Sequence, residues 1–552
     1  MKRREFIVTA ASCAAASAAG NSPEPLGKLD PLWRYSAALG PYLETGIGLT
    51  EVPGFLLEGD FPYRKRPFAK EVLFADHLSA VRLLGGYLMK GVPEESLRER
   101  DLAWRDSADK IRYRMELLRP RRQPYLDHGY REFTLVLDNV PYCFPKEPAV
   151  KGLGQYRPPA DPAEWKDFIR ELAREIVNIF SPDGAARQRF RVGTENNGRE
   201  RFDGTHQQYV RHYQDTAAAI LEVIPKARIG FFNISGVSVK SISQLDNVNA
   251  FALAEHCYSP DPRQRTPVDF IAFSRYYAPN EDPGQHGRTC RTVWDEFGRR
   301  IPALKNVSRE VHEFGVATWN MAKAGEIERA EPGALGAAQC FQMVFRLREA
   351  GVDRLWHWGL LDTAIRDRHG VQRYFPTGQA WVYTVMEYMT GADAYLFPIE
   401  NQAGPGIQRL AAGSFKKDSA LLMVSAYHPD GAMHPPETIE FRVPPALLEG
   451  TRRQPRIARL NAQDCVHSLV RGDLAKSGLL RDEYRRNPRF LGNVREMAAS
   501  RAGEVLAAEN EPAYLAAWKR SLTLQPITPA DGTVTGLFRL RIAPPEVIAI
   551  VI

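Results

Sequence analysis

Phe190-Arg191-Val192-Gly193-Thr194-Glu195-Asn196-Asn197 is the stretch that decides the organisation of the chain. Its short apolar run ends in the carboxylate of Glu195. Apolar side chains recur three or four positions apart over residues 204–224, which predicts an amphipathic helix, and residues 227–233 form the next predicted strand. The result is one βαβ repeat with a polar strand end. Catalytic groups of (β/α)₈ enzymes lie at such ends, so Glu195 is a candidate catalytic residue, and the alternative is a surface glutamate.

Strands and helices alternate through the first two thirds of the chain. The predicted strands cover 78–84, 133–137, 190–195, 227–233, 268–273, 307–313 and 352–358. The predicted helices cover 103–118, 162–180, 204–224, 292–300 and 334–349. This alternation favours a parallel sheet over a sandwich. The 552 residues suit a barrel plus a second domain, so we predict a (β/α)₈ TIM barrel over residues 30–390.

The sequence changes character near residue 395. Short alternating runs such as 420–424, 438–443 and 546–552 are broken by proline and glycine. They predict a β-rich, β-sandwich-like accessory domain over residues 391–552. A charged, helical insert is predicted within it, at about 466–518.

Residues 1–20 have the features of a targeting segment. Arg3-Arg4 precede an apolar run that begins at Phe6 and continues through small, alanine-rich sequence. The pair of arginines resembles a twin-arginine export signal, and the run is too short to span a membrane as a stable helix. We therefore expect an exported protein, periplasmic or secreted, with no stable membrane insertion.

Charge and cysteine content narrow the possible partners. The formal net charge is +7, of which the first five residues contribute +2. No basic run interleaved with aromatic residues forms a nucleic-acid-binding stripe, so no nucleic-acid partner is predicted. The arginine excess suits either an acidic substrate or a solvated surface. None of the six cysteines forms a CxxC pair, so the cysteines predict no metal site, although a disulfide between Cys257 and Cys290 stays open. We predict no cofactor. The oligomeric state stays open.

Glu195 and Glu313 both stand at predicted strand ends. If Glu195 ends the fourth strand, Glu313 ends the seventh, and both face one barrel mouth. Retaining glycosidases need two such carboxyl groups roughly 5–5.5 Å apart, one as acid/base and one as nucleophile. Tyr276 or Tyr277, after the sixth strand, are candidates to donate a hydrogen bond to the nucleophile, and Arg82, on an early strand, to supply charge.

Further residues complete a candidate carbohydrate-binding set. Sugar rings have apolar faces that stack on indoles, and Trp356 and Trp358 lie at the end of the eighth strand. Alternation places both on one side of that strand, so we expect them to form the floor of the site, the alternative being the barrel core. Asn139, Thr194 and Asn196 are the polar candidates at other strand ends.

These residues resemble glycoside hydrolase family 39, in clan A. The resemblance covers roughly residues 78–360 and is carried by Gly193-Thr194-Glu195-Asn196-Asn197, Phe202, Tyr209, Tyr213, Phe270-Ile271-Ala272-Phe273, Tyr276-Tyr277 and His312-Glu313-Phe314. It implies a retaining hydrolase of O-glycosidic bonds in an oligo- or polysaccharide. It further implies Glu195 as acid/base and Glu313 as nucleophile.

The chain departs from the family pattern at three places. Clan A usually has asparagine before the acid/base, where this chain has Thr194. The family has an Arg-x-His pattern at an early strand, and the corresponding residues here, Arg82-Leu83-Leu84, include no histidine. Phe314 replaces the tryptophan that usually follows the nucleophile. The sugar-binding residues are therefore altered, and the sugar, the linkage and endo or exo action stay open.

Alternative assignments involve other acidic residues. Glu310 lies within the strand that leads to Glu313, and strict alternation gives the two opposite orientations. Glu255 beside His256 has the composition of a metal pair but lacks HExxH-type spacing, which favours a plain loop pair. A carbohydrate-binding protein that has lost catalysis is the alternative function. Thr194 favours it, and the presence of both glutamates opposes it.

Overall fold

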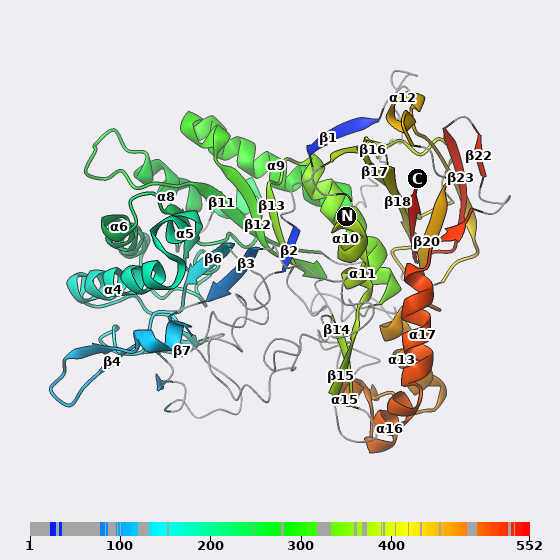
Figure 1. The fold of residues 1–552 in the computed structure, drawn as a ribbon. Coiled ribbons are helices and arrows are strands. Elements are labelled where there is room, and N and C mark those ends of the chain that lie inside the picture. The colour runs from blue at the N-terminus through cyan, green and yellow to red at the C-terminus, as the bar shows by residue number, and fades with distance from the viewer. Residues whose placement is uncertain are drawn as a thin grey trace, which may run out of the picture.

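The computed structural model describes residues 23–28, 33–35, 78–82, 84–86, 95, 98–99, 101–119, 132–151, 154–244, 247–277, 281–316, 333–357, 362–366, 372–387, 389, 392–402, 404–417, 419–430, 433–451, 454–482, 494–527, 532–534 and 536–552. Two parts are seen in Figure 1. We call them the parallel part, which spans β2 to β13, and the β-rich part, which holds the antiparallel sheets.

The parallel part contains two four-stranded parallel sheets with the orders β10-β9-β6-β3 and β11-β12-β13-β2. The strands are β2 (Trp33–Tyr35), β3 (Leu78–Arg82), β6 (Glu132–Leu137), β9 (Arg189–Val192), β10 (Arg228–Phe231), β11 (Phe270–Tyr277), β12 (Ser308–Val316) and β13 (Arg354–His357). Ile234 forms a parallel bridge with Phe273 and joins the sheets. Strands adjacent in sequence are therefore adjacent in space, and their carboxyl ends share one edge.

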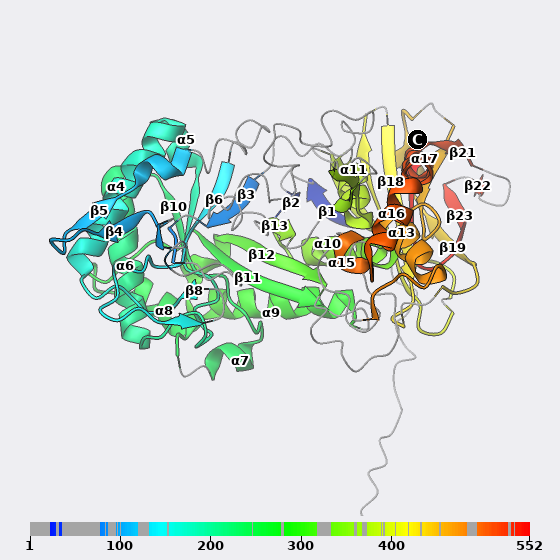
Figure 2. The ribbon, with the colours of Figure 1, turned by 90° about the horizontal axis from the view of Figure 1, so that it is seen from below.

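Helices alternate with these strands and cover their outer side in Figure 2. They are α4 (Pro162–Phe180), α5 (Pro182–Arg187), α6 (His206–Val223), α7 (Val239–Ser243), α8 (Ala250–Cys257), α9 (Pro283–Arg300) and α10 (Ala334–Glu349). The predictions over 162–180 and 334–349 are confirmed. Helix α4 begins where the Asp161 side chain accepts bonds from the Ala163 and Glu164 amides, which satisfies otherwise free N–H groups.

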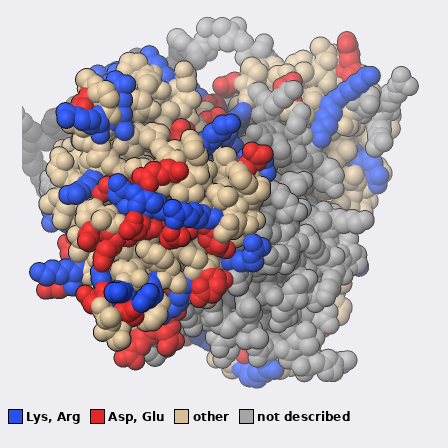
Figure 3. All heavy atoms as spheres, turned by 60° about the vertical axis from the view of Figure 1, so that its left-hand side comes forward, with Lys and Arg blue, Asp and Glu red and all other residues tan. Residues whose placement is uncertain are grey.

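Acidic and basic side chains are mixed on the helix-covered face in Figure 3. Arg170 of α4, for example, pairs with both Asp167 and Glu222, and so links α4 to α6. On this face, basic side chains therefore lie beside acidic ones that can pair with them.

The helix predicted over 103–118 is wrong. This segment forms a hairpin of β4 (Ala103–Arg105) and β5 (Ile111–Tyr113), followed by the short 3₁₀ helix η2 (Met115–Leu117). Asp106 Oδ1 accepts bonds from the amides of Ala108 and Lys110 at 2.9 and 3.0 Å, and Asp109 has φ 59. Local side-chain bonds to the backbone offer an alternative to the helix, and here they form the turn.

The β-rich part is built around a seven-stranded antiparallel sheet of β1 (Glu24–Lys28), β16 (Asp393–Phe397), β17 (Gln408–Lys416), β18 (Ser419–Tyr427), β24 (Glu546–Val551), β20 (Arg456–Leu460) and β21 (Gln525–Pro526). A second sheet contains β19 (Glu437–Arg442), β23 (Leu537–Ile542) and β22 (Gly532–Val534). Phe397, Leu422, Phe441 and Ile548 belong to the apolar core of the two sheets. Strand β1 precedes the parallel part in sequence, so both ends of the chain contribute to this sheet.

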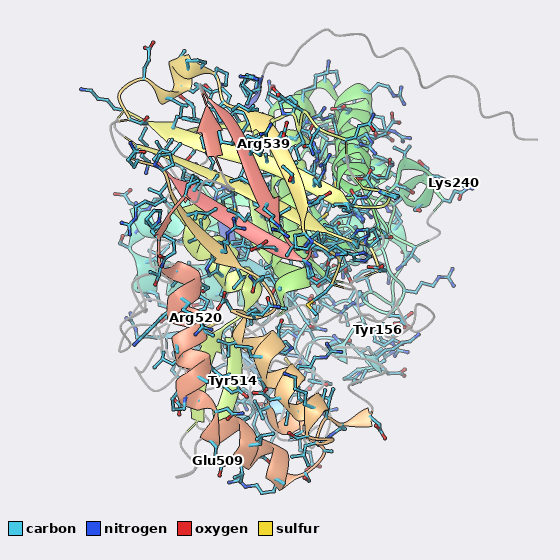
Figure 4. The ribbon with its side chains drawn as sticks, turned by 90° about the vertical axis from the view of Figure 1, so that its right-hand side faces the viewer. Tyr156, Lys240, Glu509, Tyr514, Arg520 and Arg539 are labelled. Carbon is cyan, nitrogen blue, oxygen red and sulfur yellow. The ribbon has the colours of Figure 1, made fainter. Side chains whose placement is uncertain are left out.

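Helices of the predicted insert extend from the β-rich part, as Figure 4 shows. They are α13 (Val466–Lys476), α15 (Val494–Met497), α16 (Arg501–Glu509) and α17 (Glu511–Leu522). Tyr514 of α17 donates a hydrogen bond to Asp473 of α13 at 2.9 Å. Remaining elements are β7 (Val150–Lys151), β8 (Gly154–Gln155), η3 (Pro302–Asn306), β14 (Asp362–Arg366), β15 (Gln372–Pro376), α11 (Gly378–Glu387) and α12 (Pro445–Leu448).

The two parts pack on each other through α10. Gln342 of this helix donates to Ser425 Oγ of β18 at 3.0 Å. Of the helices described, none has the length and apolar character needed to cross a membrane.

Candidate active site

The loop after β9 places Glu195 by a tight glycine turn. Gly193 has φ +87, and a Cβ there would lie 1.8 Å from Asn196 Oδ1, so only glycine fits. Glu195 itself has φ 50, and its carbonyl accepts the Gly198 amide at 2.8 Å. The sequence signal for this turn is the Gly-Thr-Glu-Asn-Asn run.

Asn233, just after β10, contacts both candidate carboxylate residues. Its carbonyl accepts the Glu195 amide at 3.1 Å. Its side-chain Nδ2 donates to Glu313 Oε1 at 3.2 Å and to Ser274 Oγ at 2.6 Å. Asn233 was not among the predicted site residues, although it ends the strand predicted over 227–233. The backbone of Glu195 and the side chain of Glu313 are thus both bonded to one fully buried residue, Asn233.

Glu313 is nearly enclosed, with 6% of its surface exposed. The Tyr276 hydroxyl donates to its Oε2 at 3.0 Å, while Asn233 occupies Oε1. Each carboxylate oxygen therefore has a donor, and the two bonds fix the orientation of the group. Tyr276 and Tyr277 were both candidates for this donor, and the structure shows the bond from Tyr276.

A bulge in β12 explains how Glu310 and Glu313 share one side of the strand. Phe273 pairs with Val311 and Ser274 with Glu313, so His312 is an extra residue. The expectation of opposite orientations assumed strict alternation and is wrong. Glu310 reaches Arg189 of β9, just as Glu313 reaches Asn233 beyond β10.

A chain of buried polar groups runs from Glu310 to the Glu195 loop. Arg189 and His312 donate to Glu310 at 3.1 and 2.6 Å, and Arg191 donates to His312 Nδ1 at 3.0 Å. Arginine can only donate, so His312 accepts at Nδ1, carries its hydrogen on Nε2 and is neutral. Burial lowers the pKa of His312 to about 4. Burial alone would raise the pKa of Glu310, but Arg189 and His312 lower it to about 2.

Thr194 is the end of this chain of bonds. It is 1% exposed, and its Oγ1 accepts a bond from Arg191 Nη2 at 2.9 Å. Asn196 is also buried and donates to the Arg201 carbonyl at 3.2 Å, while Asn139 donates to the Gln155 carbonyl at 3.0 Å. These three side chains hold loops at the strand ends.

Trp356 lies in the core and not at the floor of the site, where it was expected. Trp356 has no exposed surface and packs edge-on against His312, with ring centroids 4.4 Å apart. The alternative stated for Trp356, a position in the barrel core, is therefore the one observed. Tyr277 is buried beside His286. Trp358 and the side chain of Arg82 lie outside the described residues.

Arg201 lies beside Glu195 and was not among the predicted site residues. Its Nη2 lies 3.3 Å from Glu195 Oε2, and the two side chains are 25% and 17% exposed. The rival pair at Glu255 and His256 lies on α8, where Glu255 pairs with Arg300 at 3.3 Å. The described cysteines, including Cys257 and Cys290, are free thiols.

Among the described residues, one group has the spacing of metal ligands, His428, Asp430 and His434, and it lies in the β-rich part. The carboxylate pair itself has no such group around it within the described residues. The arrangement at the strand ends is that of two carboxylates, one enclosed and one partly open.

Comparisons with known proteins find similarity to glycoside hydrolases. The model of glycosyl hydrolases family 39 matches residues 150–289, which include Glu195, Asn233 and Tyr276 but not Glu313. An α-1,4-L-rhamnosidase from Formosa agariphila is 22% identical over 296 residues, which cover 50% of this chain. The alignment spans 56% of that relative's length.

Solved structures show the same fold over nearly the whole chain. A GH39 β-xylosidase from Caulobacter crescentus has a TM-score of 0.59 at 12% identity, with 95% of this chain and 97% of that chain covered. A GH39 enzyme from Xanthomonas axonopodis pv. citri has a TM-score of 0.60 at 12% identity, with 95% and 94% covered. These neighbours imply a TIM barrel followed by a second domain. Residues 150–289 therefore resemble glycosyl hydrolases family 39, and Glu195 lies within the matched stretch.

Proposed function

We propose that this protein is a retaining glycoside hydrolase that cleaves O-glycosidic bonds in an oligo- or polysaccharide through a covalent glycosyl-enzyme intermediate. The eight parallel strands close into a (β/α)₈ barrel in this proposal. Glu195 and Glu313 face each other across its mouth. The observation that carries the proposal is Asn233, whose carbonyl holds the Glu195 backbone and whose amide holds the Glu313 side chain.

Glu313 acts as the nucleophile in this proposal. It attacks the anomeric carbon while the leaving oxygen departs, and a covalent ester to the sugar forms. The hydrogen bonds from Asn233 and Tyr276 support this role because they hold the carboxylate in one orientation. A carboxylate held in a fixed position needs little reorganisation to reach the transition state.

Glu195 acts as the acid and then as the base. It first protonates the leaving-group oxygen and then removes a proton from the water that hydrolyses the ester. Its partial exposure supports this role because a leaving group and later a water molecule must reach it. The buried residues Thr194 and Asn196 support the loop that carries Glu195.

The export of the protein stays a prediction from Arg3-Arg4, whose residues lie outside those the structure describes. Replacing both arginines with lysine should leave precursor in the cytoplasm. Normal export of that variant would contradict the twin-arginine assignment.

Hydrolysis of a defined panel tests the proposed function. Purified enzyme is given 4-nitrophenyl glycosides of common sugars, with rhamnosides and xylosides included because those sugars occur in the names of the compared enzymes, and then polysaccharides with sized products. The expected result is release of product that Glu313→Gln abolishes. Binding of a saccharide without any hydrolysis would instead favour the carbohydrate-binding alternative.

A further inference from the structure

Arg201 is fixed in the loop that carries the proposed acid/base. Its amide donates to the Gly198 carbonyl at 3.0 Å, and its own carbonyl accepts from Asn196 Nδ2 at 3.2 Å. Its guanidinium Nη2 lies 3.3 Å from Glu195 Oε2. The backbone of Arg201 is thus anchored from both sides, while its side chain is 25% exposed and reaches over the carboxylate.

This contact conflicts with the first half of the proposed reaction. A general acid must carry a proton, whereas a cation beside a carboxylate stabilises the ionised form. Arginine does not lose its own proton in proteins. The guanidinium must therefore move away, or be neutralised by another anion, before Glu195 can protonate a leaving group.

The guanidinium has donors available for a second anion. Of its nitrogen atoms, Nε and Nη1 have no hydrogen-bond partner within the part of the chain that the structure describes. A planar fork of N–H groups suits the two oxygens of a carboxylate or of a sulfate ester. Since Glu195 protonates the leaving oxygen, a group that reaches Arg201 belongs to the sugar on the leaving side of the bond.

We propose that Arg201 binds an anionic group, a carboxylate or a sulfate, on the sugar next to the cleaved bond, and thereby releases Glu195 to hold its proton. This inference rests on the proposed function. The substrate class is then an acidic oligo- or polysaccharide with an anionic unit on the reducing side of the bond that is cut.

Aryl glycosides test this inference without knowledge of the natural polymer. The sugar identified in the panel is linked to 3-carboxyphenol, to its neutral counterpart 3-carbamoylphenol, and to 3-sulfophenol. We expect kcat/KM to favour the anionic aglycones by roughly tenfold or more, the range of one charge-assisted hydrogen bond. Arg201→Gln should bring the ratio near one, and Arg201→Lys should retain part of it. The exposed neighbour Arg199, as Arg199→Gln, is the matched control and should keep the full preference.

The pH profile separates binding from a merely structural role. With the neutral glycoside, Arg201→Gln should move the basic limb of kcat/KM to higher pH, because the acid keeps its proton longer without the cation. Loss of folding alone would lower the rate without moving the limb. Equal rates on anionic and neutral glycosides, or a preference that survives Arg201→Gln, would overturn the inference and leave the hydrolase proposal intact. The better of the carboxyl and sulfo compounds shows which anion the site takes.

Discussion

Glu195 and Glu313 are two glutamates near the carboxyl ends of parallel strands, and the fold holds them in opposite ways. Glu313 lies within β12, is 6% exposed, and has a donor on each oxygen. Glu195 follows β9 in a turn with φ 50 and is partly open beside Arg201. A nucleophile gains from a fixed position, whereas an acid/base must meet a leaving group and then water. The fixed, enclosed position of Glu313 therefore suits a nucleophile, and the partly open position of Glu195 suits an acid/base.

Removing the enclosed carboxylate should have the largest effect. Glu313→Ala leaves no group to form the covalent intermediate, so turnover should fall by about four orders of magnitude or more on every substrate. Initial rates on the glycoside identified in the panel measure this. Glu255→Ala, which removes a surface glutamate of α8, is the control and should be nearly silent. Comparable loss in both variants would contradict the assignment.

The buried hydrogen-bonded group of Arg189, Glu310 and His312 should make the stability of the fold sensitive to acid. The folded pKa of Glu310 is lowered from 4.5 to about 2, because Arg189 and His312 outweigh the cost of burial. A lowered carboxyl pKa stabilises the fold above the unfolded value and loses that contribution as pH falls from 4.5 towards 2, up to about 3 kcal/mol. Urea unfolding between pH 5 and 3 should show this slope, and Glu310→Gln should flatten it. An unchanged slope in the variant would show that other groups cause it.

Removing the Asn233 side chain should weaken the hold on Glu313. Asn233→Ala removes the donor to Glu313 while the backbone bond to Glu195 stays possible, and we expect kcat to fall roughly tenfold to a hundredfold. Ser274→Ala removes only the neighbour of that amide and should cost less. A smaller effect from Asn233→Ala than from Ser274→Ala would argue against the proposed role of the Asn233 amide at Glu313.

Gly193→Ala should destabilise the turn that carries Glu195. The added Cβ would overlap Asn196 Oδ1 in a left-handed backbone, so we expect a loss of about 2 kcal/mol in unfolding free energy. Gly236→Ala provides a matched control, since that glycine has φ +63 but no atom within 4 Å of the added Cβ. Equal losses in both variants would mean that the Asn196 contact contributes nothing.

The sequence predicted the elements with strong periodicity. Helices α4 and α10 have the predicted limits. Strands β9 and β12 overlap the predicted strands, but β9 ends at Val192, before Glu195, and β12 continues past Glu313 to Val316. The hairpin at β4 and β5 was missed because the charged segment has helical spacing, and the Asp106 turn that decides it consists of local bonds.

The two carboxylates of the candidate site could be predicted from the sequence, but only some of the residues around them could. Glu195, Glu313 and Tyr276 could be chosen because they are polar groups at strand ends. Asn233 and Arg201 could not, because their roles depend on contacts between segments far apart or across a turn. The bulge at His312 also changes which residues share a side, and no periodic pattern contains it.

The stereochemistry of azide rescue tests the central claim most directly. With an activated aryl glycoside, Glu195→Ala should still form the glycosyl-enzyme, and added azide should restore turnover and give a glycosyl azide of retained configuration. Glu313→Ala with azide should give the inverted product, because azide attacks from the vacated face. The reverse pattern would exchange the two roles, and no azide product from either variant of an otherwise active enzyme would contradict the account.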